Sequence, residues 1–170
     1  MDANVVEASR FLGETAGFWI QTTALLITGL AALGTIWFNR ISAQQRATID
    51  LILHQKVDKN LIEAKKIWAE VKGKDEFNDL ACKAHENDTE RRPHILYILN
   101  NYEFIALGVR TGAFHESTYK RAFYGVLTRD WESCDAFVIS LRKQIGSPTV
   151  FQEFEALAKK WKNSPLKKHS

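Results

Sequence analysis

The sequence predicts an all-α protein, with one transmembrane helix near the N-terminus followed by a cytoplasmic bundle of about five helices. Three observations predict this class. The segment 16–38 contains no charged residue. With 9 glycines and 3 prolines in 170 residues, the chain has few helix breakers. After Arg40, apolar residues recur at three- and four-residue spacing, and no convincing alternating strand pattern appears.

Four parts follow from this pattern. We expect a short N-terminal tail at 1–15, a transmembrane helix at 16–39, a cytoplasmic helical domain at 40–163 and a loose basic tail at 164–170. The composition, 45% hydrophobic and 25% charged, is that of an ordinary globular chain, so the membrane character is local. The net charge of +3 is too small to argue for binding to nucleic acid.

The apolar segment has the length and the ends of a membrane span. A helix needs about 20 apolar residues to cross a hydrocarbon core of about 30 Å. Phe18-Trp19 lies at one end and Trp37-Phe38 at the other, and the two tryptophans are about 27 Å apart at the helical rise. Tryptophan is enriched at both water–lipid interfaces. The polar residues inside are Gln21 and four threonines, whose hydroxyls can bond to the helix backbone.

Two alternatives compete with a span. A signal peptide has a basic start and a shorter apolar region, whereas Asp2, Glu7 and Glu14 make this N-terminus acidic. A helix of this length in a soluble core would normally carry a polar face. We therefore favour the span.

The orientation follows from basic residues near the two ends. Arg10 stands alone on the N-terminal side, against Arg40, Arg46 and Lys56 on the other. The positive-inside rule then places residues 40–170 in the cytoplasm and the N-terminus outside. Two cysteines without CxxC spacing, Cys82 and Cys134, fit reduced thiols in that compartment.

One side of the span carries small residues: Ala24, Thr28, Ala31 and Thr35. Small residues at this spacing let two helices approach closely in lipid. We expect the partners to be membrane lipid and either further copies of this chain or a membrane-associated protein. The alternative is that alanine and threonine are simply common in membrane helices.

Beyond the span, the spacing predicts a single long helix over 41–71. Its apolar face consists of Ile49, Leu53, Val57, Leu61, Ala64, Trp68 and Val71. The helix would form a rod of about 80 Å with the span if the two are continuous, a question that the sequence leaves open. A short helix is expected near 75–86.

Three further helices are predicted from their capping residues. One begins after Asp88-Thr89, with Pro93 in its first turn, and ends at Gly112. The next begins near Ser117 and ends at Gly146. The last has Ser147 as cap and Pro148 at the first position, and ends before residue 164.

The candidate site is a polar cluster on the helix that ends at Gly112: Arg92, Asn100, Glu103 and Arg110. A carboxylate, an amide and guanidinium groups could bind an anion or lipid headgroup, or start an acid–base site. The favoured alternative is a hydrogen-bond network that fixes helix packing, because no nucleophile or metal-ligand set accompanies the cluster.

Arg110 and His115 have the Arg-x4-His spacing that resembles the ribonuclease motif of HEPN-type helical domains. There the two residues share one helix, whereas Gly112 interrupts the segment here. The five histidines show no ligand spacing, and no nucleotide-binding or serine-hydrolase motif occurs. We assign no catalytic residue, no metal and no cofactor.

The chain resembles a family of short single-pass bacterial and phage-borne membrane proteins, catalogued as a domain of unknown function. The similarity lies in RATIDLI after the span, in RRPHILYILNNYEFIALGVRTGAFHE, and in a tryptophan followed by FVISLR. It covers about residues 12–145 and is most specific at Leu99-Asn100-x-Tyr102-Glu103, with Gly108 and Arg110 following. The resemblance implies a membrane-anchored helical domain, and it implies no established activity or site residues.

The sequence thus favours a non-enzymatic, membrane-anchored interaction protein that acts through self-assembly or a protein partner, with a defence- or phage-associated role as a further expectation. The alternatives are a nuclease-like enzyme that uses Arg110 and His115, and a module that binds lipid or anions.

Overall fold

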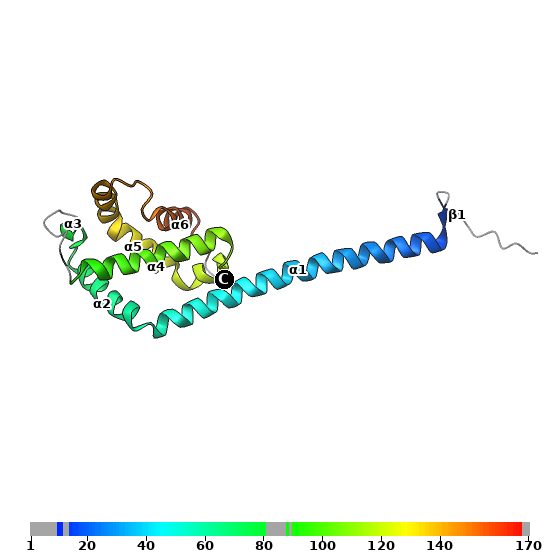
Figure 1. The fold of residues 1–170 in the computed structure, drawn as a ribbon, viewed down its shortest axis with the longest axis horizontal. Helices are drawn as coiled ribbons and strands as arrows, with labels where there is room; N and C mark the ends of the chain where they lie inside the picture. The colour runs from blue at the N-terminus through cyan, green and yellow to red at the C-terminus, as the bar shows by residue number, and fades with distance from the viewer. Residues whose placement is uncertain (1–9, 12–13, 81–87, 89, 168–170) are drawn as a thin grey trace, which may run out of the picture. The chain divides into compact units, whose positions relative to one another are not determined.

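The computed structural model describes residues 10–11, 14–80, 88 and 90–167. The predicted all-α class is confirmed: α1 (Ala16–Val57) is followed by five helices in the described residues (Figure 1). These are α2 (Lys59–Gly73), α3 (Phe77–Leu80), α4 (Arg92–Thr111), α5 (Glu116–Ile145) and α6 (Gln152–Asn163). The chain forms two compact units, Met1–Ala43 and Gln44–Ser170.

The N-terminal unit contains a short hairpin that the sequence did not predict. Strands β1 (Arg10–Phe11) and β2 (Glu14–Thr15) pair antiparallel, with Arg10 opposite Thr15. A strand of two residues is too short to show alternation, which is why its pattern could not be recognised. The remaining residues of the predicted tail lie outside the described residues.

A break at Asp58 shows that the prediction of one helix over 41–71 is wrong. α1 runs through the apolar segment to Val57, and α2 begins at Lys59. Asp58 has an extended backbone, and its carboxylate accepts a hydrogen bond from the N–H of Leu61 at 3.1 Å and one from the hydroxyl of Tyr97 at 3.0 Å. Asp stabilises such an N-cap conformation, so the helix ends without Gly or Pro.

The break divides the predicted apolar face into two parts. Beyond Asp58, the apolar residues are buried in the second unit: Leu61, Ala64, Trp68 and Val71. Before it, Ile49, Leu53 and Val57 are 49%, 54% and 70% exposed. The two sets therefore do not form one face.

Both predicted glycine caps are confirmed. α4 ends at Gly112 and α5 at Gly146, with φ of 74° and 70°. Glycine adopts this left-handed conformation without the strain that a side chain would add. Pro93 lies in the first turn of α4, as expected. Of the predicted helix near 75–86, the structure describes α3, and residues 81–86 lie outside the described residues.

The predicted start of α6 at Ser147-Pro148 is wrong. A turn precedes the helix, which begins at Gln152. Phe151 has a φ of 57° and places its side chain in the core, with 7% exposed. Because Glu103 on α4 binds the N–H groups that follow, α6 starts where that carboxylate can reach it.

The core lies between α2, α4, α5 and α6. α4 packs against both α2 and α6, and α5 packs against α3 and α6 (Figure 1). The ring of Tyr102 on α4 stacks on Phe154 of α6 with centroids 4.5 Å apart, and Trp68 of α2 contacts Phe77 at 4.8 Å. Cys134 is free and buried, while Cys82 lies outside the described residues. Polar residues of α4 can therefore reach both of its neighbours, α2 and α6.

Candidate functional site

The structure brings together two of the four residues of the predicted polar cluster. Arg92 is the first residue of α4, where its guanidinium donates to Gln144 at 3.1 Å and lies 5.7 Å from the ring centroid of Phe137. Asn100 is exposed in the middle of the helix. Glu103 and Arg110 both reach α6.

The contact of Glu103 and Arg110 with α6 is built on the N-terminus of that helix. The carboxylate of Glu103 accepts the backbone N–H of Glu153 at 3.1 Å and that of Phe154 at 2.8 Å. The side chain of Glu153 pairs with Arg110 Nε at 2.6 Å. The free N–H groups of a helix start favour a carboxylate partner, so this part of the cluster joins α4 to α6.

A cavity of about 320 Å³ lies beside this junction, between α4, α6 and the start of α5. Its apolar lining includes Val109 and Leu157. On its rim, Lys160 pairs with Glu116 at 2.7 Å, as Arg110 pairs with Glu153. Each charge on the rim thus has an opposite charge beside it, and a charged ligand would have to displace one of these pairs.

Glu116 is held in its charged form at this rim. Burial raises the pKa of its carboxyl group, but hydrogen bonds from Lys160 and from Nε1 of Trp161 outweigh burial and leave the pKa below its ordinary value. The carboxylate therefore ties the start of α5 to α6, and a group held in its charged form is poorly suited to donate a proton.

Arg110 and His115 do not share a helix. α4 ends at Thr111, and His115 is the residue before α5. The N–H of His115 donates to the hydroxyl of Thr48 at 2.8 Å, and its Nδ1 lies 2.8 Å from the hydroxyl of Thr118. Arg110 instead pairs with Glu153 on α6. The arrangement therefore differs from the HEPN-type motif.

A buried ionic network was missed at the sequence level. Asp130 is 7% exposed, and its two carboxylate oxygens bind Lys72 Nζ at 2.7 Å and the hydroxyl of Tyr102 at 2.6 Å. Burial, followed by the charge of Asp130, raises the pKa of Tyr102 well above its ordinary value. Asp130 stands between Leu127 and Trp131 on the apolar side of α5, and a charge in that place is the signal that could have identified the network.

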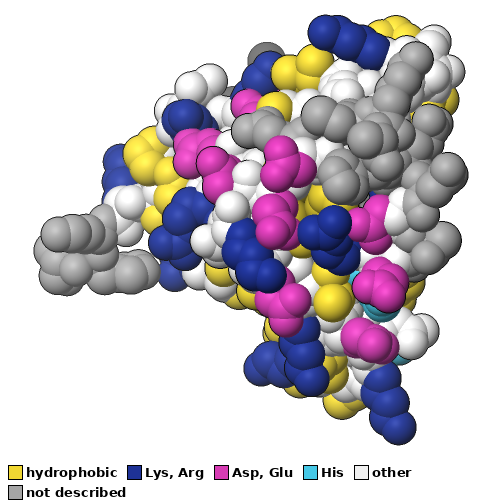
Figure 2. All heavy atoms as spheres, turned by 90° about the vertical axis from the view of Figure 1, so that its left-hand side faces the viewer, with side chains coloured by type: hydrophobic (Ala, Val, Ile, Leu, Met, Phe, Trp, Pro, Cys, Tyr) yellow, Lys and Arg dark blue, Asp and Glu magenta, His cyan; other side chains and the backbone are white. Residues whose placement is uncertain are grey.

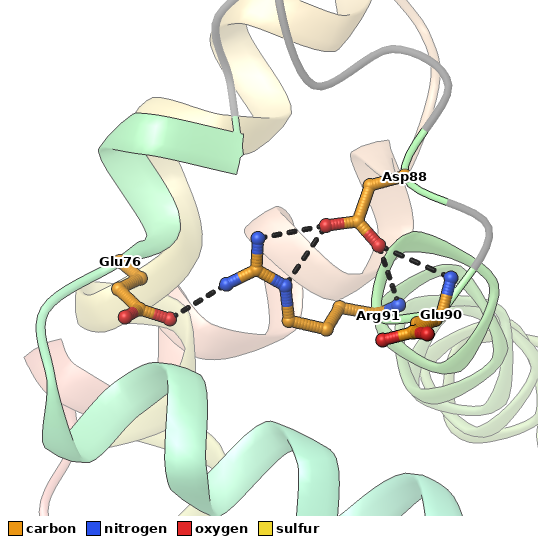
Figure 3. A network of polar contacts seen from close by, with 4 residues as sticks. All are labelled: Glu76, Asp88, Glu90 and Arg91. Atoms are coloured by element: carbon orange, nitrogen blue, oxygen red, sulfur yellow. Dashed lines mark hydrogen bonds and ion pairs between the residues drawn. The ribbon is translucent and has the colours of Figure 1, made fainter.

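A second polar network surrounds Arg91 at the start of α4 (Figure 3). Its guanidinium binds Glu76 and Asp88, each at 2.8 Å. Asp88 also accepts the backbone N–H groups of Arg91 at 2.7 Å and Glu90 at 3.1 Å. The hydrogen bond from the Arg91 backbone is the main cause that lowers the pKa of Asp88. Asp88 thus caps the turn before α4, but it is not the predicted N-cap of the helix itself: that position is Arg91, which has no side-chain cap bond. Thr89 lies outside the described residues.

Charges of both signs are interspersed on the surface that Figure 2 shows, which is the left-hand side of Figure 1. Three lysines of α6 also have acidic partners: Lys159 binds Glu155, Lys160 binds Glu116 and Lys162 binds Glu132. Within the described ranges, no group of three His, Cys, Asp or Glu residues could hold a metal ion. Of the predicted loose tail at 164–170, residues 168–170 lie outside those ranges.

The most unusual surface belongs to the first part of α1. In the described part of the chain, α1 is the one helix long and apolar enough to cross a membrane, and none of its most apolar window is buried. Thr28 donates to the carbonyl of Ala24 at 2.8 Å, and Thr35 to that of Ala31 at 2.9 Å. The predicted small-residue side therefore has no unsatisfied hydroxyl.

Comparison with known proteins gives a family and no activity. The family model described as "Domain of unknown function (DUF4760)" matches residues 20–161, which is most of the chain. No match was found among curated proteins or among solved structures. The match includes α2 to α5 together with most of α1 and of α6. The chain belongs to the DUF4760 family, a domain of unknown function.

Proposed function

We propose that this chain is a single-pass protein of the bacterial inner membrane, whose helical domain lies in the cytoplasm and acts by assembling with itself or with a protein partner. One observation carries the proposal: α1 exposes apolar side chains around its whole first part. Leu25, Leu30 and Trp37 are 74%, 69% and 67% exposed. Such a surface is costly in water and is stable in lipid.

The polar groups of this segment support the same conclusion. Each hydroxyl of Thr28 and Thr35 is bonded to a carbonyl of its own helix. A helix also satisfies its own backbone groups, which a lipid environment requires. The hydroxyls of Thr28 and Thr35 and the backbone of the helix therefore need no bond to water.

The orientation rests on charge. Arg40, Arg46 and Lys56 follow the apolar segment, against Arg10 before it, which favours a cytoplasmic bundle. Cys134 is a buried free thiol, which is compatible with a reducing compartment. The bacterial setting, and a defence- or phage-associated role within it, rest on the family resemblance alone.

Assembly is favoured over catalysis by what the polar residues do. Glu103 binds the start of α6, Arg110 binds Glu153, and His115 binds Thr118. Side chains that hold helices together in this way build a rigid surface for binding. These contacts support an interaction domain over a nuclease centre or an anion site at the same residues.

Flotation of membranes on a density gradient tests the anchor. The tagged full-length chain should float with the membranes after an alkaline wash, whereas Leu30→Arg should stay below them, because an arginine at the centre of a span costs about 2.5–3.5 kcal/mol. Ile62→Arg is the matched control, since Ile62 is an exposed residue of α2, and it should float. A wild-type chain that stays at the bottom, or that is shortened by cleavage after the apolar segment, would contradict the proposal.

A further inference from the structure

The second unit has one end at which the chain enters it. Gln44 is its first residue, and the side chain of Gln44 donates to the carbonyl of Gly112 at 2.6 Å. One turn later, the hydroxyl of Thr48 accepts the N–H of His115 at 2.8 Å. The turn between α4 and α5 therefore lies where the chain enters the unit, and we call this part of the unit the entry end.

The covalent chain keeps the entry end close to the proposed membrane. The predicted span ends at Asn39, and Gln44 is the fifth residue after it. Five residues extend over at most about 18 Å, and the lipid headgroups occupy roughly the first 5–7 Å beyond the hydrocarbon core. This limit comes from the length of the chain alone and holds for any arrangement of the two units. The entry end is thus tethered near the headgroups.

The C-terminal end of α6 lies at the same end of the second unit. Near the start of α5, Lys120 donates to the carbonyl of Ser164, and its ammonium group lies 5.8 Å and 5.9 Å from the ring centroids of Tyr124 and Trp161. Lys160 and Nε1 of Trp161 both bind Glu116, the first residue of α5. The basic segment that ends α6 is therefore held at the entry end.

This segment carries a surplus of positive charge. No acidic residue occurs between positions 156 and 167, which contain four lysines: Lys159, Lys160, Lys162 and Lys167. Glu116 pairs with Lys160, but Lys120 stands four residues after Glu116 on the same helix, so one carboxylate serves two ammonium groups. Ion pairs between exposed side chains are weak, so the exposed Lys160 remains able to exchange its partner for a phosphate.

The opposite end of the unit has a different charge pattern. α5 has 30 residues and is therefore about 45 Å long, so its last turn lies far from the entry end. On the side where α3 lies, charges of both signs are interspersed (Figure 2), and Arg91 is enclosed by Glu76 and Asp88. The lysine surplus is thus a property of the entry end rather than of the surface as a whole.

We propose that the entry end binds the anionic phospholipid headgroups of the membrane that holds the span, through Lys120, Lys160 and Lys167. Anionic lipids attract lysines that lie within a Debye length of the surface, about 8–10 Å. The tether supplies the high effective concentration that a few lysines need. This inference rests on the proposed membrane anchor and goes beyond it by assigning a lipid-binding surface to the second unit.

Quenching by a nitroxide attached to lipid headgroups tests the contact. The full-length chain with Cys82→Ser is reconstituted in vesicles of phosphatidylcholine, alone or mixed with phosphatidylglycerol, and the buried Cys134 is left unchanged. A fluorescent label is placed at Ser117→Cys, in the first turn of α5, or at Thr149→Cys, beyond the far end of α5; both positions are exposed. The label at residue 117 should be quenched several-fold more with phosphatidylglycerol than without it, and added salt should remove the excess. The label at residue 149 should show no such excess. Equal quenching at residue 117 in the two kinds of vesicle would overturn the proposal.

Charge-removing variants identify the lysines. Lys120→Gln combined with Lys167→Gln should remove more than half of the excess quenching, and Lys167→Gln alone, outside every helix, should remove part of it. The matched control combines Lys74→Gln with Lys143→Gln, at two exposed lysines away from the entry end, and should keep the excess. An equal effect of the two double variants would overturn the assignment.

An alkaline wash of the same vesicles separates the two levels of failure. A chain that the wash releases would contradict the anchor and this contact with it. A chain that is retained but shows no excess quenching would contradict the lipid contact alone.

Discussion

The carboxylate of Glu103 on α4 accepts the backbone N–H of Phe154, at 2.8 Å, in the first turn of α6. It also accepts the N–H of Glu153 at 3.1 Å. A cap supplied by α4 stabilises the first turn of α6 and also fixes the position of α6 relative to α4. We expect Glu103→Ala to lower the free energy of unfolding by about 1–2 kcal/mol, measured by chemical denaturation of the full-length chain in detergent.

Two other substitutions give the controls for this cap. Glu103→Gln keeps one oxygen acceptor and should lose less than Glu103→Ala. Asn100→Ala, at an exposed position of the same helix, should stay within about 0.5 kcal/mol of the wild type. If Glu103→Ala were as stable as Asn100→Ala, the cap would not contribute to stability.

The buried pair of Asp130 and Lys72 should be sensitive to the loss of one partner. Asp130→Ala leaves the ammonium of Lys72 and the hydroxyl of Tyr102 without their acceptor. We expect a loss of about 3 kcal/mol, the lower end for buried pairs, because the side chain of Lys72 is 32% exposed. Tyr102→Phe should cost about 1 kcal/mol, and an equal loss for the two variants would contradict this ranking.

Gly108 leaves no room for a side chain. A Cβ at this position would lie 2.2 Å from a ring carbon of Phe114, so Gly108→Ala should destabilise the protein by about 1–3 kcal/mol. Gly125→Ala is the matched control within α5, where the nearest group is the end of Arg129 at 3.7 Å. It should stabilise by about 0.5–1 kcal/mol. If the melting temperature of Gly108→Ala rose as that of Gly125→Ala is expected to, the crowding at Gly108 would be absent.

The cap at Asp88 should make stability depend on pH in acid. Its pKa is lowered in the folded protein, chiefly by the hydrogen bond from the Arg91 backbone. The stabilisation is therefore present above the ordinary value of 3.8 and is lost as the pH falls through the lower folded value. Asp88→Asn should melt below the wild type at about pH 5–7 and approach it in stronger acid. A difference that grows on acidification would contradict this sign.

The sequence predicted the helix ends that depend on local chemistry. Gly112 and Gly146 adopt the left-handed conformation that a helix C-terminus needs, and this preference belongs to the residue itself. The apolar face of α4 was likewise predicted, because apolar residues that recur every three or four positions indicate the buried side of a helix. The residues of this face are buried in the structure: Ile95, Ile98, Tyr102, Ile105 and Val109.

The two wrong boundaries depend on contacts from a distant part of the chain. Asp58 ends α1 with the help of Tyr97, and α6 begins where Glu103 can bind its N-terminus. Both partners lie on α4, far from these boundaries in the sequence. The same reason applies to the candidate site, where spacing placed Glu103 and Arg110 on one helix face but could not identify α6 as the partner.

The absolute mass of the full-length chain, extracted in mild detergent and measured by light scattering, tests the central claim most directly. The account predicts either a complex of two or more 19.4 kDa chains or a complex of this chain with a second protein, which mass spectrometry of the same sample identifies. A single 19.4 kDa chain with no second protein would contradict assembly.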